Sequence, residues 1–326
     1  MDRMHRPAVS TLPRPLGLSP AVAGMLCCAV SALSYTMASI CMRRLSTECP
    51  PSWAACNKEF VSATVAGAWL LCEVLRGRRV LPSWPTVGIL LLLGLAVQLL
   101  GNLPSQWSYG IVGMAIVIAA NVGTMLAASA AMGWLFLGER VSRRSIVAIA
   151  LLLASLGLLV LGAEAAGRQI SPESSPWIIA AAVAGPCFAG VIYALLSIAI
   201  RHNVTRDTRI SVVIFSVTVM GVLSLGPISV HQLGVEELLQ TPPEQYAWMY
   251  AAGFFNLLGF VAITKGLQLT TVVHANVLNA SQVALAAMAG IMLFNEPRNP
   301  WLMLGVGLTA LGVVLIDRPR EAVETV

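Results

Sequence analysis

Charged side chains are scarce in this sequence of 326 residues: they make up only 11%, whereas apolar residues make up 57%. Soluble domains carry roughly 25% charged residues, so this chain could not cover the surface of a soluble fold. The mean hydropathy of +0.79 agrees with this reading. We therefore interpret the chain as a polytopic protein of the cell inner membrane, with lipid as its surroundings.

Motifs for nucleic-acid, metal or nucleotide chemistry are also lacking. The net charge of +5 comes from small groups of arginines between apolar runs, so we expect no nucleic-acid partner. The seven cysteines show no C-x-x-C or other metal-ligand spacing and are typical of small buried apolar residues. No G-x-x-x-x-G-K-[ST] loop occurs. We therefore expect no bound metal.

What the chain has in abundance is long apolar runs. A hydrocarbon core of ~30 Å needs about 20 apolar residues per helix, and ten runs approach that length. Fifteen Lys and Arg residues lie in one alternating set of connecting segments and four in the other, with Lys58 set aside, which predicts both termini in the cytosol. The runs are 21–41, 53–74, 86–108, 113–137, 145–162, 176–200, 209–228, 246–267, 271–294 and 300–317.

The chain also resembles itself. The segment "GWLFLGERVSRRSIVAIALLLASLGLLVLG" (133–162) has a counterpart in "GIMLFNEPRNPWLMLGVGLTALGVVLID" (290–317), and in each copy a Gly precedes a Glu by six residues, at Glu139 and at Glu296. Halves of five helices, an odd number, must have opposite topology, so the prediction is an all-α fold of ten transmembrane helices in two inverted five-helix repeats. The predicted parts are a cytosolic tail 1–20, a first repeat 21–162 opened by Ser19-Pro20, a second repeat 176–317 opened by Ser175-Pro176, and a cytosolic tail 318–326.

These features resemble the drug/metabolite transporter superfamily in its EamA-like branch, which also ends its fourth and ninth helices with motifs like "LFLGERVS" and "LFNEP". The resemblance covers about residues 20–318. It implies a permease that moves small metabolites, such as amino acids, amines or related compounds, by alternating access, without ATP hydrolysis or a bound cofactor. Coupling to protons or to counter-substrate is expected, and a second copy of the chain is left open as a partner. For Glu139 and Glu296 we favour a structural role at a corner between helices.

Polar residues inside the apolar runs predict a cargo cavity, because burying them in lipid is costly. Gln98, Asn102 and Gln106 recur every four residues and form one stripe on the third run. Pro104 should bend that run. The candidate substrate-binding residues are Tyr35, Asn57, Lys58, Glu59, Gln98, Asn102, Gln106, Asn121, Tyr193, Asn256, Lys265, His274, Asn276, Asn279 and Gln282.

Lys58 and Glu59 stand side by side in the second run and are its most unusual pair. Neighbouring helical residues point about 100° apart, so we expect the two not to pair with each other and at least one to face the cavity. The alternative is that Lys58 reaches back to the outer interface. The resemblance implies a basic residue near the place of Lys58. Glu59 is the candidate proton carrier, since an acid in such a cavity can exchange its proton.

Two other functions remain open. A nucleotide-sugar or sugar-phosphate antiporter would need several cationic residues at cargo depth, where only Lys58 and Lys265 are candidates. A membrane-embedded enzyme acting on lipids would need clustered acids, and the runs contain no D-x-x-D, H-E-x-x-H or H-x-x-x-D pattern. The sequence therefore favours a transporter over an enzyme.

Overall fold

The computed structural model describes residues 19–78, 80, 82–137, 143–161, 169–204, 209–270, 272–296 and 300–315, and these residues form helices and no strand. The all-α prediction is thus confirmed for this part of the chain. The predicted tails lie outside it, apart from Ser19 and Pro20, and so does Glu139. The helices are α1 (Pro20–Leu45), α2 (Pro51–Leu75), α3 (Trp84–Ala96), η1 (Val97–Asn102), α4 (Leu103–Val112), α5 (Met114–Leu137), α6 (Arg143–Leu161), α8 (Pro176–Val204), α9 (Ile210–Leu239), α10 (Pro243–Leu269), α11 (Val272–Asn279), α12 (Gln282–Leu293) and α13 (Pro300–Leu315).

Six helical stretches in the described residues are long and apolar enough to cross a membrane. They are Val22–Leu45, Trp84–Val112, Met114–Gly133, Pro176–Ile200, Ile210–Leu239 and Pro243–Leu269. The other described helices also fall on predicted runs, but they are shorter or, like α2, carry more charge. The protein is therefore a multi-pass helical membrane protein, while the count of ten spans stays a prediction.

The third predicted run is one helix with a π-helical turn in its middle. α3 passes into η1, where the N–H of Leu103 bonds the carbonyl of Gln98 five residues earlier, and then into α4. The proline at 104 lacks the N–H that an α-helix would use to bond Leu100, which favours the wider turn next to it. The predicted disturbance at Pro104 thus takes the form of a π-turn that carries two candidate residues, Gln98 and Asn102.

Two runs differ from their predicted extents. The ninth run, expected to be continuous from 271 to 294, is divided into α11 and α12 by a turn at Ala280 and Ser281. The seventh run, expected to end at 228, continues as α9 to Leu239, with a kink at Gly234, where φ is 78°. Pro227 does not end α9, because a proline inside a helix often kinks the helix rather than stopping it.

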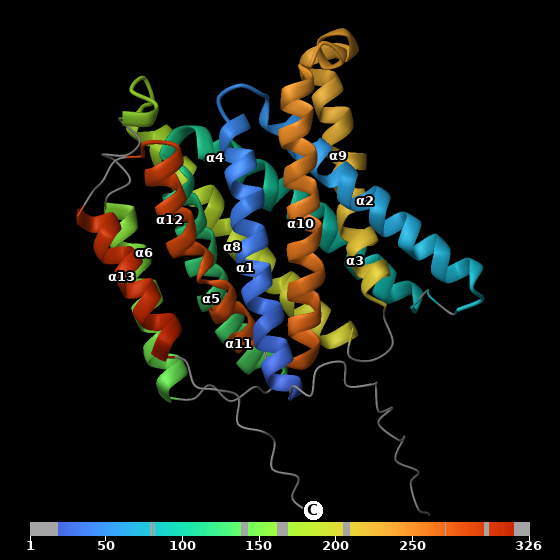
Figure 1. The fold of residues 1–326 in the computed structure, drawn as a ribbon, viewed down its shortest axis with the longest axis horizontal. Helices are drawn as coiled ribbons and strands as arrows, with labels where there is room; N and C mark the ends of the chain where they lie inside the picture. Colours follow the sequence, from blue (N-terminus) through green and yellow to red (C-terminus); the bar gives the residue numbers. More distant parts are fainter. Residues whose placement is uncertain are drawn as a thin grey trace, which may run out of the picture.

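α6 and α13 pack against each other at one side of the molecule, at the left of Figure 1. Ser155 of α6 is 2% exposed, and its Oγ donates to the carbonyl oxygen of Gly305 in α13 at 2.6 Å. The polar side chain thus has a backbone partner in the contact between the two helices.

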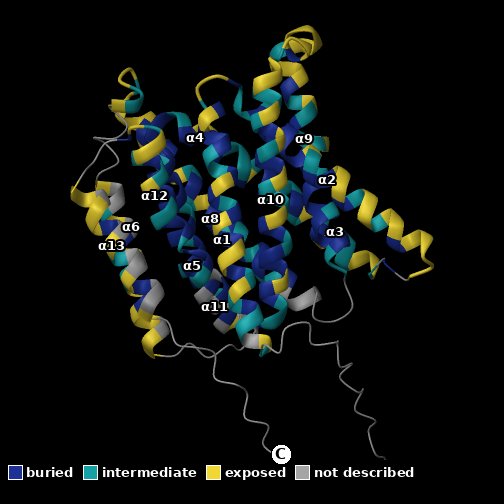
Figure 2. Ribbon diagram, in the orientation of Figure 1, coloured by how far each residue is buried: buried dark blue, intermediate teal, exposed yellow. Residues whose placement is uncertain are grey.

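The remaining helices pack around a buried centre. α1 lies along α10, α5 along α8, and α2 along α9. In Figure 2 the buried residues gather on the faces that these helices turn toward one another, while exposed residues mark α13 and the far end of α2. The polar residues of the third run lie at this centre, since η1 contacts both α8 and α9.

Candidate functional site

A cavity lies in the middle of the bundle, and the space inside it for water-sized molecules is about 190 Å³. One water needs roughly 10–15 Å³ by this measure, so the space would hold on the order of a dozen waters or one small metabolite. Eleven of the fifteen candidate substrate-binding residues line it: Tyr35, Lys58, Glu59, Gln98, Asn102, Gln106, Asn121, Tyr193, Asn256, Asn279 and Gln282.

The other four candidates are not placed there. Asn57 is buried outside the cavity, where its Nδ2 donates to the carbonyl oxygen of Trp53 at 3.1 Å. Lys265 is exposed, and its Nζ donates to Gln268 Oε1 at 3.1 Å. The side chains of His274 and Asn276 lie outside the described residues. We therefore do not include Asn57 or Lys265 in the proposed site.

Lys58 and Glu59 form an ion pair with each other, with 3.0 Å between Nζ and Oε1. The expectation that neighbours on a helix could not pair was therefore wrong. Both side chains are long, so each can turn sideways by several ångströms, and a buried charge gains more from a partner than it loses in strain. Lys58 is 7% exposed and Glu59 is 2% exposed, so the pair is withdrawn from solvent.

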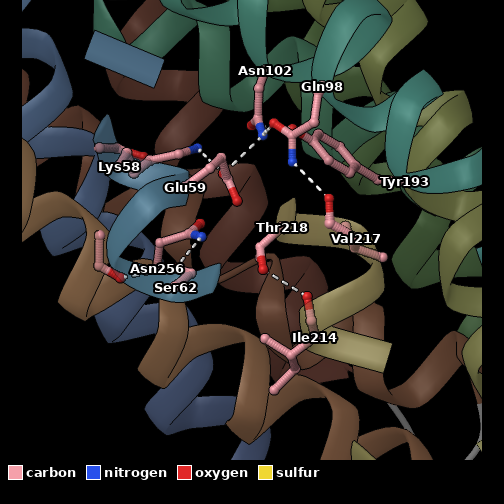
Figure 3. Close-up of polar contacts among 12 residues, drawn as sticks. Lys58, Glu59, Ser62, Gln98, Asn102, Tyr193, Ile214, Val217, Thr218 and Asn256 are labelled. Atoms are coloured by element: carbon pink, nitrogen blue, oxygen red, sulfur yellow. Dashed lines mark hydrogen bonds and ion pairs between the residues drawn. The ribbon is translucent and has the colours of Figure 1, made fainter. Parts of the chain in front are cut away.

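Asn102 joins the ion pair to the rest of the polar cluster (Figure 3). Its Nδ2 donates to Glu59 Oε1 at 3.1 Å and to Gln98 Oε1 at 2.7 Å, and its Oδ1 accepts from the Tyr193 hydroxyl at 2.8 Å. Gln98 Nε2 in turn donates to the carbonyl oxygen of Val217 at 3.3 Å. Side chains from α2, η1 and α8 and a carbonyl of α9 thus belong to one hydrogen-bonded network.

Glycines on neighbouring helices make room for three of these side chains. A Cβ added at Gly221 of α9 would lie 2.6 Å from Cγ of Glu59. A Cβ at Gly259 of α10 would lie 3.0 Å from the Tyr35 ring, and one at Gly101 would lie 3.3 Å from the Tyr193 hydroxyl. The helices approach closely where the site needs bulky groups, which is a common use of small residues in membrane bundles.

Several lining residues were missed by sequence reasoning. Tyr109 and Ser39 share a hydrogen bond of 3.1 Å from the tyrosine hydroxyl to the serine Oγ, and both line the cavity. Aromatic and aliphatic lining residues, such as Phe260 and Ile263, give no signal in a sequence where more than half of the residues are apolar.

The charges that face the cavity balance. Lys58 and Glu59 are the charged residues among those that line it, and they carry opposite signs. The remaining polar lining consists of amides and hydroxyls, which can donate or accept hydrogen bonds. Such a cavity can bind a zwitterion, whose two charges it can neutralise, or an uncharged polar molecule. It offers no excess of positive charge to neutralise a phosphate.

The fold defines the class of this protein as a multi-pass helical membrane protein with a polar cavity at its centre. More particularly, the sequence model of the EamA-like transporter family matches residues 177–317. The match confirms the resemblance to the drug/metabolite transporter superfamily over these residues. No curated protein matches the chain in sequence.

Twenty-seven chains of solved structures are similar in fold. One of them, titled only "Crystal structure of protein", superposes with a TM-score of 0.64 at 17% sequence identity. The superposition covers 90% of this chain and 96% of that chain. At this identity the likeness shows the fold alone, but it extends the agreement beyond the segment that the family model matches.

Proposed function

We propose that the protein is a secondary transporter that moves a small polar metabolite, such as an amino acid, an amine or a related compound, across the inner membrane by alternating access. The single observation that carries this proposal is the buried Lys58–Glu59 pair on the wall of the central cavity. Burying two charges is costly, and charged groups inside membrane proteins usually mark a pathway for substrate or ions. The family match favours transport over the alternative of a lipid-modifying enzyme.

Alternating access would use the two halves 21–162 and 176–317 as an inverted repeat of five and five helices. If a two-fold rotation exchanges the two halves, each contact between two helices must have an equivalent contact elsewhere or map onto itself. The contact of α1 with α10 has its counterpart in α8 with α4, that of α5 with α8 in α12 with α1, and that of α2 with α10 in α9 with α3. α2 with α9 and α6 with α13 are their own counterparts. This pattern supports the proposed repeat.

The starts of the two halves agree in detail as well. The Oγ of Ser19 accepts from the N–H of Val22 at 3.4 Å, and the Oγ of Ser175 accepts from the N–H of Ile178 at 3.4 Å. Each serine stands directly before a proline that opens a helix, which is a favoured beginning. The same local structure therefore begins both halves, as a duplication would require.

The balanced charge of the cavity bears on the cargo. A nucleotide sugar or a sugar phosphate would bring two or more negative charges to a wall whose one described cation, Lys58, is already paired with Glu59. A zwitterion or a neutral polar compound could instead form ionic or hydrogen-bonded contacts with Lys58 and Glu59 in place of those that the two residues make with each other. We therefore place amino acids and related compounds ahead of the phosphate-bearing alternative.

Glu59 is the proposed coupling group. Its Oε1 is held by both Lys58 and Asn102, at 3.0 and 3.1 Å. A proton on this carboxyl group would cancel the charge that both partners bind, and so would loosen α2 from η1. Proton uptake could thereby change the packing around the cargo. Exchange of one cargo molecule for another remains the second mode of coupling.

The test is a thermal-shift screen of amino acids, amines, sugars and nucleotides against the purified protein, followed by flux of the radiolabelled hit in proteoliposomes. A ligand that binds the native state raises its apparent stability. Asn102→Leu should abolish flux of the hit, whereas Asn57→Leu should retain most of it, because the half-buried Asn102 lines the cavity and the buried Asn57 does not. Equal losses at equal membrane levels would contradict the proposed site, and a shift with nucleotide sugars alone would favour the antiporter.

Orientation in the membrane can be tested separately. We propose that both termini are cytosolic, so a reporter fused after Val326 should be cytosolic and a tag inserted near Glu236 should be periplasmic. The segment 229–245 contains no Lys or Arg, which favours translocation. Finding both sites on the same side would overturn the ten-span proposal.

A further inference from the structure

One buried carboxylate ties three segments together at the end of the bundle where α1 ends and α5 begins. Glu296, which follows α12, is 6% exposed. Its Oε1 accepts from Arg43 Nε at 3.1 Å and from the backbone N–H of Met114 at 2.7 Å, and its Oε2 lies 3.4 Å from the N–H of Ala115. A carboxylate at this place satisfies unpaired amides at the start of α5 and the positive end of its dipole.

The backbone around Glu296 is shaped to admit this carboxylate. Gly113, at the junction of α4 and α5, has φ of 83°, and a Cβ there would lie 2.7 Å from Glu296 Oε1. A Cβ at Gly290 would lie 2.4 Å from Glu296 Oε2. Asn295 directly before it has φ of 51°, which residues other than glycine seldom adopt. The motif from Gly290 to Glu296, noted in the sequence, thus leaves the room that the buried carboxylate needs.

Arg43 is also buried and makes further contacts besides the ion pair with Glu296. It is 8% exposed, its Nη1 donates to Ser46 Oγ at 3.0 Å, and its guanidinium lies 5.4 Å from the centroid of the Phe294 ring. We call this ion pair, with its contacts to the start of α5, the Arg43–Glu296 latch. It joins α1 and α5 of the first proposed half to the α12–α13 connection of the second.

The latch borders the cavity. Met42, next to Arg43, lines the cavity, and its carbonyl oxygen accepts from Gln106 Nε2 at 3.0 Å. One turn further along α4, a Cβ at Gly110 would lie 3.1 Å from the carbonyl oxygen of Ser46. α1 and α4 are therefore in close backbone contact beside this part of the cavity wall.

We propose that the Arg43–Glu296 latch closes the cavity at this end and must break each time the cavity opens there. The inference rests on the proposed transport function, because a carrier that works by alternating access must open at both ends in turn. Opening at this end requires α1 or α5 to move away from the α12–α13 connection, and each such movement separates Glu296 from one of its partners. The strength of the latch therefore sets how often the protein is open on this side.

Accessibility of the cavity to a thiol reagent tests the latch without any cargo. The full-length protein, with its native cysteines replaced by alanine and with Ser39→Cys on the cavity wall, is reconstituted in proteoliposomes. A membrane-impermeant maleimide is added on the side where Glu48 lies. Arg43→Gln and Glu296→Gln should each raise the labelling rate about tenfold, the factor that corresponds to about 1.4 kcal/mol. Glutamine at 296 keeps an oxygen for the N–H of Met114.

The matched control is Arg44→Gln. Arg44 is the neighbour of Arg43 and pairs with Glu48, but both side chains of that pair are exposed. This change should leave the labelling rate as it is. Ser46→Ala keeps both charges of the latch and removes two hydrogen bonds of Ser46 Oγ, one from Arg43 Nη1 and one to the carbonyl oxygen of Arg43. It should raise the labelling rate by a smaller factor, and it tests the latch if the charge-removing variants do not fold.

Wild-type labelling in folded Arg43→Gln and Glu296→Gln would overturn the latch, and so would an equal rise in Arg44→Gln. If only Ser46→Ala folds, an unchanged rate in that variant overturns it. A failure of the transport proposal would look different. No compound would then show flux in proteoliposomes, whatever the labelling rates.

Discussion

Replacing Lys58 by leucine separates the structural effect of the buried ion pair from its effect on transport. At 3.0 Å, the attraction between two unit charges is about 5 kcal/mol at an effective dielectric constant of ~20. Removal of one partner of a buried pair typically costs about 3–5 kcal/mol, because the other charge remains buried. We therefore expect Lys58→Leu to lower the free energy of unfolding by about 3 kcal/mol, since Asn102 still donates to Glu59.

The double variant Lys58→Leu/Glu59→Leu should regain most of this loss. Well-packed apolar residues often replace a buried pair without net cost, so its stability should lie within about 1 kcal/mol of the wild type. The coupling energy of the two changes, measured by unfolding in detergent, should then be about 2 kcal/mol or more. Transport should be abolished in Lys58→Leu and also in the double variant, because the double variant has lost both groups that can bind or couple cargo.

Two results would refute this reasoning. Unchanged stability of Lys58→Leu would mean that the pair is not formed in the membrane, and that Lys58 reaches the interface instead. Wild-type flux from the stable double variant would mean that neither charge takes part in transport. Lys58→Arg, which keeps the charge, should retain part of the flux and serves as the conservative control.

Further predictions follow from the glycines and from Cys49. Gly221→Ala should destabilise the protein and impair transport, because the new methyl group would lie 2.6 Å from Cγ of Glu59, and overpacking costs about 1–3 kcal/mol. Gly88→Ala, with open space around it, should be neutral or slightly stabilising; equal unfolding temperatures for the two variants would contradict the close contact. Burial raises the pKa of the Cys49 thiol, in the α1–α2 connection, to about 12. Because little reactive thiolate then exists at pH 8, Cys49 should resist alkylation in the native protein and react once the protein is denatured. Mass spectrometry of the peptide that contains Cys49 would measure this difference, and rapid labelling of the native protein would contradict the burial of Cys49.

Much of the fold could be predicted from local sequence. Apolar runs of about 20 residues identify helices because every backbone polar group must be paired within the membrane. The amide stripe of Gln98, Asn102 and Gln106 indicated a cavity correctly in the sense that all three line it. Four-residue spacing places side chains on one face of a helix whatever lies around it.

Other parts of the site could not be predicted because they depend on which helices meet. The angle between neighbouring helical residues led us to expect that Glu59 would not pair with Lys58, and this was wrong. The close approach of Glu59 to Gly221 depends on the contact between α2 and α9, which the sequence does not give. Lys265 was a candidate for the site by its charge, yet it is exposed and pairs with Gln268 of its own helix. The hydrogen bond from Ser155 to the carbonyl oxygen of Gly305 likewise depends on the contact between α6 and α13.

The sequence by itself determined that this is a helical membrane protein, since composition and run length set the solvent that each segment must meet. It also determined the family resemblance and the faces on which amides lie. Only the tertiary structure decided that Glu296, far from Arg43 in the chain, joins it and the start of α5 in one buried contact. Long-range pairing of this kind depends on the relative positions of helices, and these positions arise from packing across the whole bundle rather than from any local pattern.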